Sequence, residues 1–352
     1  MNERRRGFLR VSGMVTAAAA AAIWGPGPAW AQRIRVLDGG GGGSDRLIAV
    51  GQSSAELRRL LAGIRIGPFK THAGMTVFWL SGADTPPTLD VMTLDDARAQ
   101  NALVIAERAQ ATVPELTVDN RGKSHILLLA GEILVGGKQN RVLKEDVLLP
   151  PHSGARDLGV YCVEQGRWNV GRKDFESKST FAGAGLRSHL MAKSDQRQVW
   201  AEVARRAQIA QSNSLTQSYQ EIYEKPEVQQ HLSDVERGIE ATPPAGTSGA
   251  AVFAGGTLAG LDLFTHGTLF GREWPKLLRS YAIDAYRVPQ PQAPGDPAKA
   301  RETLRALLDA AARAEGTVRG NAGVGQIFEF AVGSSRGAAL TFEGQVVHTA
   351  VL

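Results

Sequence analysis

The sequence predicts an α+β fold: a β-rich centre, formed by a curved antiparallel sheet or partial barrel, with packed helices in a single large domain. First, strands follow one another in runs separated by turns, without the regular helix alternation of doubly wound sheets. Second, apolar residues recur at helical spacing in 194–237, 272–286 and 297–315. Third, the 352 residues include one cysteine and are 43% hydrophobic, so stability must come from a core without an internal disulfide.

The first 31 residues are typical of a bacterial twin-arginine export signal. The motif places consecutive arginines before Phe-Leu, at Arg5, Arg6, Phe8 and Leu9. The apolar run 11–24 is shorter than the ~20 residues that a spanning helix needs, and Ala31 and Gln32 flank the expected cleavage site. We therefore expect export by the twin-arginine machinery, no stable membrane anchor after cleavage, and a periplasmic or secreted protein.

Removal of the signal leaves a nearly neutral chain. The full sequence carries a net charge of +5, and residues 1–31 contain four arginines and one glutamate, so the mature chain keeps a charge of about +2. A net charge so close to zero gives no indication of the basic surface that binds nucleic acid. After the signal, we expect 32–46 to be a flexible glycine-rich tether and 47–352 to be the folded domain.

The first elements of the domain follow from local signals. Residues 54–62 are expected to form a short helix and 75–80 a strand. Another helix should begin after Thr93, whose hydroxyl can accept a hydrogen bond from the backbone N–H of Asp96.

The centre of the chain has the pattern of strands. Residues 125–130 form a continuous apolar run, as expected of a strand covered on both faces. Further strands are expected over 141–149 and 159–164, separated by a turn that begins at Pro150 and Pro151.

The second half alternates helical and extended segments. In the helical segment 194–237 we expect an apolar stripe that includes Trp200 and Val203, with arginines such as Arg206 facing outward. Strands follow over 251–264. Asp296 is a good cap for the last helix, and alternating strands should close the chain from residue 326.

Local motifs do not support a metal, iron–sulfur or dinucleotide cofactor, so the cofactor is unknown. The seven histidines lack metal-binding spacings, and a single cysteine excludes cysteine-ligated clusters. Residues 333–337 fit the string of a nucleophile elbow, but a strand follows where a helix is required. We interpret them as a hairpin turn, and the glycines at 255–256 as another, since a dinucleotide site needs a different glycine spacing.

Polar side chains embedded in apolar strands between 131 and 168 mark the candidate site. Buried charges are costly unless paired, so these side chains should contact one another or a ligand. One interpretation is a buried network that orders the sheet. The other is a pocket in which arginines hold an anion, amides form hydrogen bonds, an indole forms a wall and a glutamate acts as acid and base. The residues are Glu132, Gln139, Asn140, Arg141, Glu164, Arg167 and Trp168.

Three segments of the central block carry a family resemblance. They read G-E-I-L-V-G-G-K-Q-N-R-V at 131–142, V-L-L-P-P at 147–151 and V-Y-C-V-E-Q-G-R-W at 160–168. Together with Asp262-Leu263-Phe264, Trp274 and Val346-Val347-His348, they resemble the ARG and rhodanese-phosphatase-superfamily-associated protein domain family, where ARG stands for ADP-ribosylglycohydrolase.

The resemblance spans nearly all of the mature chain. It implies a shared site made of the polar residues above together with Cys162 and His348, and it suggests phosphorylated or ADP-ribose-related metabolites. From its apolar neighbours we interpret Cys162 as a small buried residue and not as a nucleophile.

Three functions remain open. The first is a periplasmic module that binds a small anionic or polar ligand in a pocket built on the 131–168 sheet. The second is a hydrolase of a phosphorylated or ADP-ribose-like metabolite, with Glu132 or Glu164 as general acid/base and Arg141 and Arg167 holding the anion. The third is a scaffold protein in which the same residues form only a structural network.

Overall fold

The computed structural model describes residues 49–82, 89–112, 114–168, 174–287 and 295–352. The chain divides into two units, residues 1–33 and 34–352, and only the second contains described residues. The expected signal peptide and tether therefore lie outside the described part. Within that part, strands and helices form the α+β fold that the sequence predicts.

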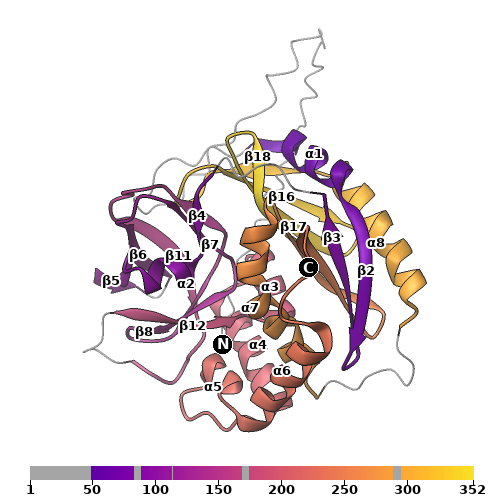
Figure 1. Cartoon of the computed structure of the whole chain (residues 1–352). Helices are drawn as coiled ribbons and strands as arrows, with labels where there is room; N and C mark the ends of the chain where they lie inside the picture. Colours follow the sequence, from indigo (N-terminus) through magenta and orange to yellow (C-terminus); the bar gives the residue numbers. More distant parts are fainter. Residues whose placement is uncertain (1–48, 83–88, 113, 169–173, 288–294) are drawn as a thin grey trace, which may run out of the picture. The chain divides into compact units, whose positions relative to one another are not determined.

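A nine-stranded sheet, curled into a half barrel, is the largest element (Figure 1). Its strands pair antiparallel throughout, which confirms the predicted curved antiparallel sheet. The order is β1 (Ala49–Ser53), β15 (Glu315–Arg319), β16 (Gln326–Val332), β17 (Ser335–Phe342), β18 (Gln345–Val351), β14 (Thr257–Phe264), β13 (Thr247–Ala254), β3 (Met75–Ser81) and β2 (Arg65–His72). The last strand of the chain, β18, thus lies in the middle of the sheet.

Apolar runs give this sheet two buried faces. In β13, Ala250 and Val252 belong to one core, and Ala251 and Phe253 belong to another. Successive side chains of a strand point to opposite faces, so a strand covered on both sides needs apolar residues at every position.

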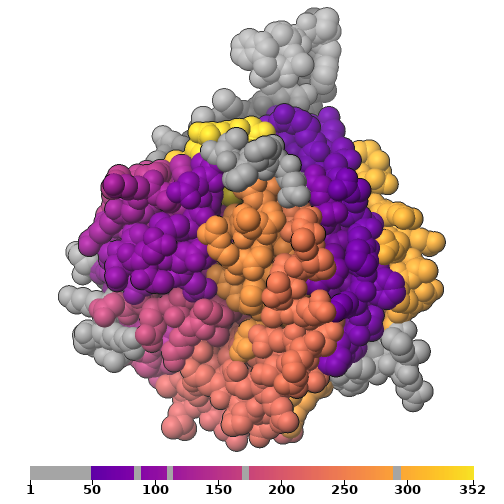
Figure 2. Space-filling view, in the orientation of Figure 1, coloured from indigo at the N-terminus to yellow at the C-terminus, as the bar shows by residue number. Residues whose placement is uncertain are grey.

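Helices cover both faces. The helices α1 (Ala55–Gly63) and α8 (Pro297–Ala312) pack in one core. The other core contains α3 (Ala184–Met191), α4 (Gln196–Ala210), α5 (Tyr219–Tyr223), α6 (Pro226–Ile239) and α7 (Gly267–Ala285). In Figure 2, α6 and α7, in salmon and orange, separate the indigo strands β2 and β3 from the purple segment that precedes residue 160.

Two smaller sheets surround a third core. One has the order β12 (Phe175–Phe181), β8 (Glu132–Gly136), β9 (Arg141–Leu143), β11 (Arg156–Cys162), β6 (Glu115–Asn120) and β5 (Leu103–Thr112). The other has the order β10 (Val147–Leu149), β7 (His125–Leu128) and β4 (Val91–Met92). The short helix α2 (Leu94–Ala99) packs in the same core. At its start the Thr93 hydroxyl accepts from the Asp96 N–H, as the sequence predicts, and the Asp96 carboxylate accepts from the Thr93 N–H, which completes a capping box.

The prediction of one strand over 141–149 is wrong. The chain leaves β9 at Leu143 and enters β10 of a different sheet at Val147. The three residues between them, 144–146, are called the β9–β10 break below.

Helix boundaries and faces also differ from the predictions. The segment 194–237 contains three separate helices, α4, α5 and α6. Arg206 is buried and not outward, because its guanidinium pairs with Asp284 at 3.0 Å and donates to the Ile283 carbonyl. The last helix ends at Ala312, and Glu315 already belongs to β15. Among the described helices, none combines the length and hydropathy needed to cross a bilayer.

Candidate functional site

The β9–β10 break places the Asp146 carboxylate inside the protein, where it is 7% exposed. Oδ1 accepts a hydrogen bond from the backbone N–H of Ala130 at 2.8 Å, and Oδ2 lies 2.6 Å from Nδ1 of His348. Because a buried carboxylate needs partners, these two contacts account for the departure of the chain from a regular strand here.

His348 lies on β18 between two carboxylates. Phe264 of β14 pairs with His348 across the strands, and Asp262, two residues earlier, projects from the same face of the sheet. Nε2 of His348 therefore lies 3.2 Å from Oδ1 of Asp262, while Nδ1 faces Asp146.

Two helical residues complete the cluster. Arg187 of α3 contacts both oxygens of the Asp262 carboxylate, with Nη1 3.0 Å from Oδ2. Tyr281 of α7 donates its hydroxyl to the same carboxylate. Bidentate arginine–carboxylate contacts are strong and fix the orientation of both groups. We call these five residues, Asp146, His348, Asp262, Arg187 and Tyr281, the His348 cluster.

Opposite charges determine protonation within the His348 cluster. Burial by itself lowers the pKa of His348, but the carboxylates of Asp146 and Asp262 outweigh it and raise that pKa to about 9. Burial by itself would raise the pKa of Asp262, yet Arg187 and His348 hold it well below its usual range. At neutral pH, His348 is therefore an imidazolium held between carboxyl groups.

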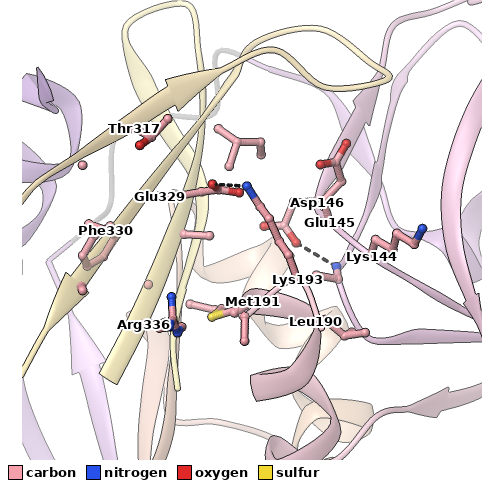
Figure 3. Close-up of a pocket in the computed structure, with 18 of the residues that line it drawn as sticks. Lys144, Glu145, Asp146, Leu190, Met191, Lys193, Thr317, Glu329, Phe330 and Arg336 are labelled. Atoms are coloured by element: carbon pink, nitrogen blue, oxygen red, sulfur yellow. Dashed lines mark hydrogen bonds and ion pairs between the residues drawn. The ribbon is translucent and has the colours of Figure 1, made fainter. Parts of the chain in front are cut away.

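The His348 cluster borders a cavity of about 650 Å³ (Figure 3). Asp146 and Arg187 line this cavity, and His348 lies behind Asp146. Further lining comes from the β9–β10 break, from Tyr161, from the end of α3 and the residues after it, and from strands β15 to β18. Residues from distant parts of the chain thus enclose one space.

A chain of ion pairs forms one charged wall of the cavity. Arg319 of β15 pairs with Glu145 and with Glu329 of β16, where Nη2 lies 2.7 Å from Oε1. The other oxygen of Glu329 accepts from the Lys193 ammonium at 2.6 Å. Figure 3 shows this last pair as a dashed line near the middle of the view.

Two lining cations lack a carboxylate partner within the described part of the chain. The ammonium of Lys144 lies 4.3 Å from the centre of the Tyr161 ring, and burial lowers its pKa. Arg336 of β17 is exposed. Neither forms an ion pair with a described carboxylate, although the charge of Glu145 attracts the Lys144 ammonium and partly offsets the effect of burial on its pKa. Both can therefore contact an anion that enters the cavity.

The rest of the lining is largely apolar. Leu190 and Met191 come from α3, and Ile327 and Phe330 come from β16. A cavity with an apolar lining and a few polar groups is the usual form of a small-molecule site.

The predicted site residues around Glu164 form hydrogen bonds with one another and with neighbouring residues of the protein. The Glu164 carboxylate accepts from Arg167 at 2.6 and 2.9 Å, from the backbone N–H of Asn140 at 3.0 Å and from Thr216 at 2.9 Å. The Asn140 amide donates to Ser218. Burial would raise the pKa of Glu164, but these contacts lower it. None of these side chains lines the cavity.

Arg141 and Gln139 lie beside this network. The Gln139 amide donates to the Glu164 carbonyl at 2.9 Å, and Nη1 of Arg141 donates to the Gln139 carbonyl at 3.0 Å. Arg141 is fully buried, and burial lowers its pKa. Among the described residues, its Nε and Nη2 have no hydrogen-bond partner, although Glu107 lies 3.8 Å from Nη2.

Glu132 lies apart from Glu164, in a third cluster. It contacts the Lys276 ammonium of α7, which also pairs with Glu273 at 2.8 Å and Asp95 at 3.4 Å. Burial raises the pKa of Glu132, and the neighbouring carboxyls add to this, because three acids share one lysine. The structure therefore does not bring the two proposed catalytic glutamates together.

Trp168 and Cys162 differ in environment. Trp168 is 49% exposed, with the Lys138 ammonium 4.8 Å from its ring centre. Cys162 is fully buried, and burial raises the pKa of its thiol, so the unreactive thiol form is favoured.

The sequence reasoning missed most residues of the cavity. It named His348 but not its partner Asp146, and it quoted Asp262 only within the family resemblance. Both are polar residues within apolar strands or beside them, so the argument used for the polar block would have found them.

No three histidine, cysteine, aspartate or glutamate side chains of the described residues are arranged to hold a metal ion.

Comparison with known proteins gives one match. A model of the family described as ARG and Rhodanese-Phosphatase-superfamily-associated Protein domain matches residues 63–352. No curated protein and no solved structure matches the chain. The matched range contains the whole His348 cluster and every residue that lines the cavity.

Proposed function

Because the chain belongs to the ARG and Rhodanese-Phosphatase-superfamily-associated Protein domain family, whose description names no reaction, we propose a function from its geometry. The protein binds a small anionic ligand in the cavity beside the His348 cluster. The observation that carries this proposal is the charge of the cavity lining: it holds five lysine and arginine side chains against four aspartate and glutamate side chains, and the cations Lys144 and Arg336 form no ion pair with a described carboxylate.

The contacts of Glu164 favour the cavity as the ligand site over the polar residues of 131–168. Every oxygen of the Glu164 carboxylate is already used by the protein, and a fully bonded buried group gains little from a ligand. Each oxygen of Asp146, in contrast, has one partner among the described residues, Ala130 or His348, and the carboxylate lines the cavity. It can accept hydrogen bonds from hydroxyl or amino groups of the ligand.

A hydrolase is the second candidate, and one observation favours it. A carboxylate that lines a cavity and contacts a buried histidine is an arrangement used in acid–base chemistry. In that case Asp146 would be the acting carboxylate, in place of Glu132 or Glu164, because neither glutamate lines the cavity.

Thermal unfolding of the chain from Gln32 onward tests ligand binding. Inorganic phosphate, sugar phosphates, ADP-ribose and carboxylic acids would be added at constant ionic strength. We expect at least one of them to raise the melting temperature, because a ligand that binds only the native state stabilises it. The variant Ala338→Phe, which fills the cavity from β17, should abolish that increase.

The matched control is Ala298→Leu, at an exposed position on α8 outside the cavity. It should keep the wild-type response. If Ala338→Phe folds and still responds as the wild type does, the ligand binds elsewhere and the proposal is refuted.

Export to the periplasm or beyond is also part of the proposal, and it rests on Arg5 and Arg6. Cell fractionation followed by mass spectrometry should find a mature protein that begins at Gln32. Replacing both arginines by lysine should leave the uncleaved precursor in the cytoplasm. Normal processing of that variant would exclude the twin-arginine route.

A further inference from the structure

Lys193 occupies a backbone position that usually belongs to glycine. It follows the C-cap residue Ala192 of α3 and has a φ angle of 52°. Its N–H donates to the Leu190 carbonyl, and the N–H of Ser194 donates to the His189 carbonyl, both at 3.0 Å. These two hydrogen bonds define a Schellman motif, whose left-handed position favours glycine because a Cβ is strained there.

The strain is not offset by a strong contact of the side chain. Lys193 pairs with Glu329, but its side chain is 59% exposed. Exposed ion pairs add little to stability, since water screens the charges and two long side chains must be ordered. Nine other non-glycine residues among those described also have a positive φ angle, so it is the place of Lys193 in the cavity lining, together with the strain, that makes it a candidate for a role in binding.

The surroundings of Lys193 show which chemical group it would bind. The carboxylate of Glu329 accepts from Lys193 on one oxygen and from Arg319 on the other, at 2.6 and 2.9 Å. A carboxylate therefore already lies between a lysine and an arginine in the cavity wall. A ligand carboxylate has the same charge and shape as this side chain.

The apolar lining determines the rest of the ligand. Leu190 and Met191 belong to α3, which ends just before Lys193, and Ile327 lies two residues before Glu329 on the same face of β16. Anchored at Lys193, a ligand would extend its body over these three side chains. Such a body gains free energy with each buried methylene group.

We infer that Lys193 anchors the carboxylate of a ligand with an apolar body, and that this carboxylate displaces Glu329 from the lysine ammonium. The inference rests on the proposed ligand-binding function of the cavity and specifies its ligand as an amphiphilic organic acid. Glu329 keeps its contact with Arg319 when the ligand is bound. No covalent bond forms or breaks.

Calorimetric titration with straight-chain monocarboxylates tests the inference. The probes are acetate, butyrate, hexanoate and octanoate, with hexanol as the uncharged control, at fixed ionic strength. Affinity should rise about fourfold for each added methylene group until the cavity is filled. Hexanol should bind at least about tenfold more weakly than hexanoate, because it cannot pair with an ammonium.

Two variants identify the anchor. Lys193→Gly should weaken hexanoate binding at least about tenfold, since it removes a charge-assisted hydrogen bond. Its melting temperature should stay the same or rise by about 1 to 3 °C, because glycine relieves the left-handed strain. Glu329→Gln should tighten binding about threefold or more, because the competing carboxylate is weakened.

The control for backbone effects is Gln211→Gly. Gln211 has a φ angle of 53° at the C-cap of α4, in the same left-handed region, and it does not line the cavity. The change should alter stability as Lys193→Gly does while leaving hexanoate affinity unchanged.

The outcomes separate this inference from the proposal on which it rests. Wild-type affinity for hexanoate in Lys193→Gly, together with its loss in Ala338→Phe, would refute the anchor and leave the cavity as the site. If phosphate binds and the affinity of the monocarboxylates does not depend on their chain length, the anchor is also refuted and the cavity remains the site. If no probe of either panel binds the wild type, both proposals fail. A melting temperature several degrees lower in Lys193→Gly would make the lysine structural and overturn the inference.

Discussion

Raising the pH from 6.5 to 9 should destabilise this protein through His348. The imidazole is buried between Asp146 and Asp262, and its pKa rises from 6.5 to about 9 on folding. A group whose pKa is raised in the folded state stabilises it fully below the unfolded pKa, and the contribution disappears as pH passes the folded pKa. The difference corresponds to about 3 kcal/mol of unfolding free energy, at about 1.4 kcal/mol for each pKa unit.

Urea unfolding followed by circular dichroism, at half-unit pH steps from 6 to 9.5, measures this loss. In thermal melts the same loss amounts to roughly 5 to 10 °C. Glu132 also has a raised pKa, so it titrates in part of the range and its contribution must be subtracted. The variant His348→Gln supplies that subtraction, because its amide can contact both aspartates without titrating.

The difference in unfolding free energy between wild type and His348→Gln should therefore be largest near pH 6.5, and its pH-dependent part should vanish above pH 9. His152→Gln, at an exposed position, is the matched control and should follow the wild-type profile. A wild-type stability that falls no more steeply than that of His348→Gln between pH 7 and 9 would refute the assignment of a buried imidazolium.

Three further predictions concern the remaining polar block and the core. Glu164→Gln should cost about 2 to 4 kcal/mol in urea unfolding, because Arg167 loses its buried counter-charge, and should leave ligand-induced stabilisation intact; a cost below about 1 kcal/mol would contradict the network. Trp168→Ala should change stability by less than about 1 kcal/mol and leave ligand affinity, measured by titration, unaltered; a clear loss of affinity would bring the ring into the site. Trp274→Ala should lower the unfolding free energy by about 3 to 5 kcal/mol, because the indole is buried and its ring centre lies 5.0 Å from that of Trp79. Unfolding close to that of the wild type would contradict this packing.

Short-range signals explain the parts of the fold that the sequence predicted correctly. The caps Ser54, Thr93 and Asp296 each accept a hydrogen bond from a backbone N–H two or three positions further on. The start of each helix can therefore be predicted from a few neighbouring residues. The prediction placed Arg206 on the wrong face because its ion-pair partner, Asp284, lies far away in the sequence, on α7. Periodicity cannot detect a buried arginine whose partner is distant in sequence.

The candidate site shows the same limit. Neighbours in sequence were grouped into one site, yet Glu132 faces α7 while Glu164 faces Arg167. The cavity instead joins residues that are far apart, as in the contact of Asp146 with His348 across 202 positions. That buried polar residues must be paired could be inferred from the chain alone, whereas the identity of each partner required the sheet order.

The central place of β18 in the nine-stranded sheet affects when this protein can fold. The segment 345–351 follows every other described strand in the sequence, yet it pairs with β17 on one side and β14 on the other. Until it emerges, the edges of both strands stay open, and unpaired edges invite pairing with other chains. His348 lies on the same strand, so the His348 cluster beside the cavity is completed only when β18 has joined the sheet. A product that lacks residues 345–352 would lack both the strand that joins the two halves of the sheet and the imidazolium beside the cavity.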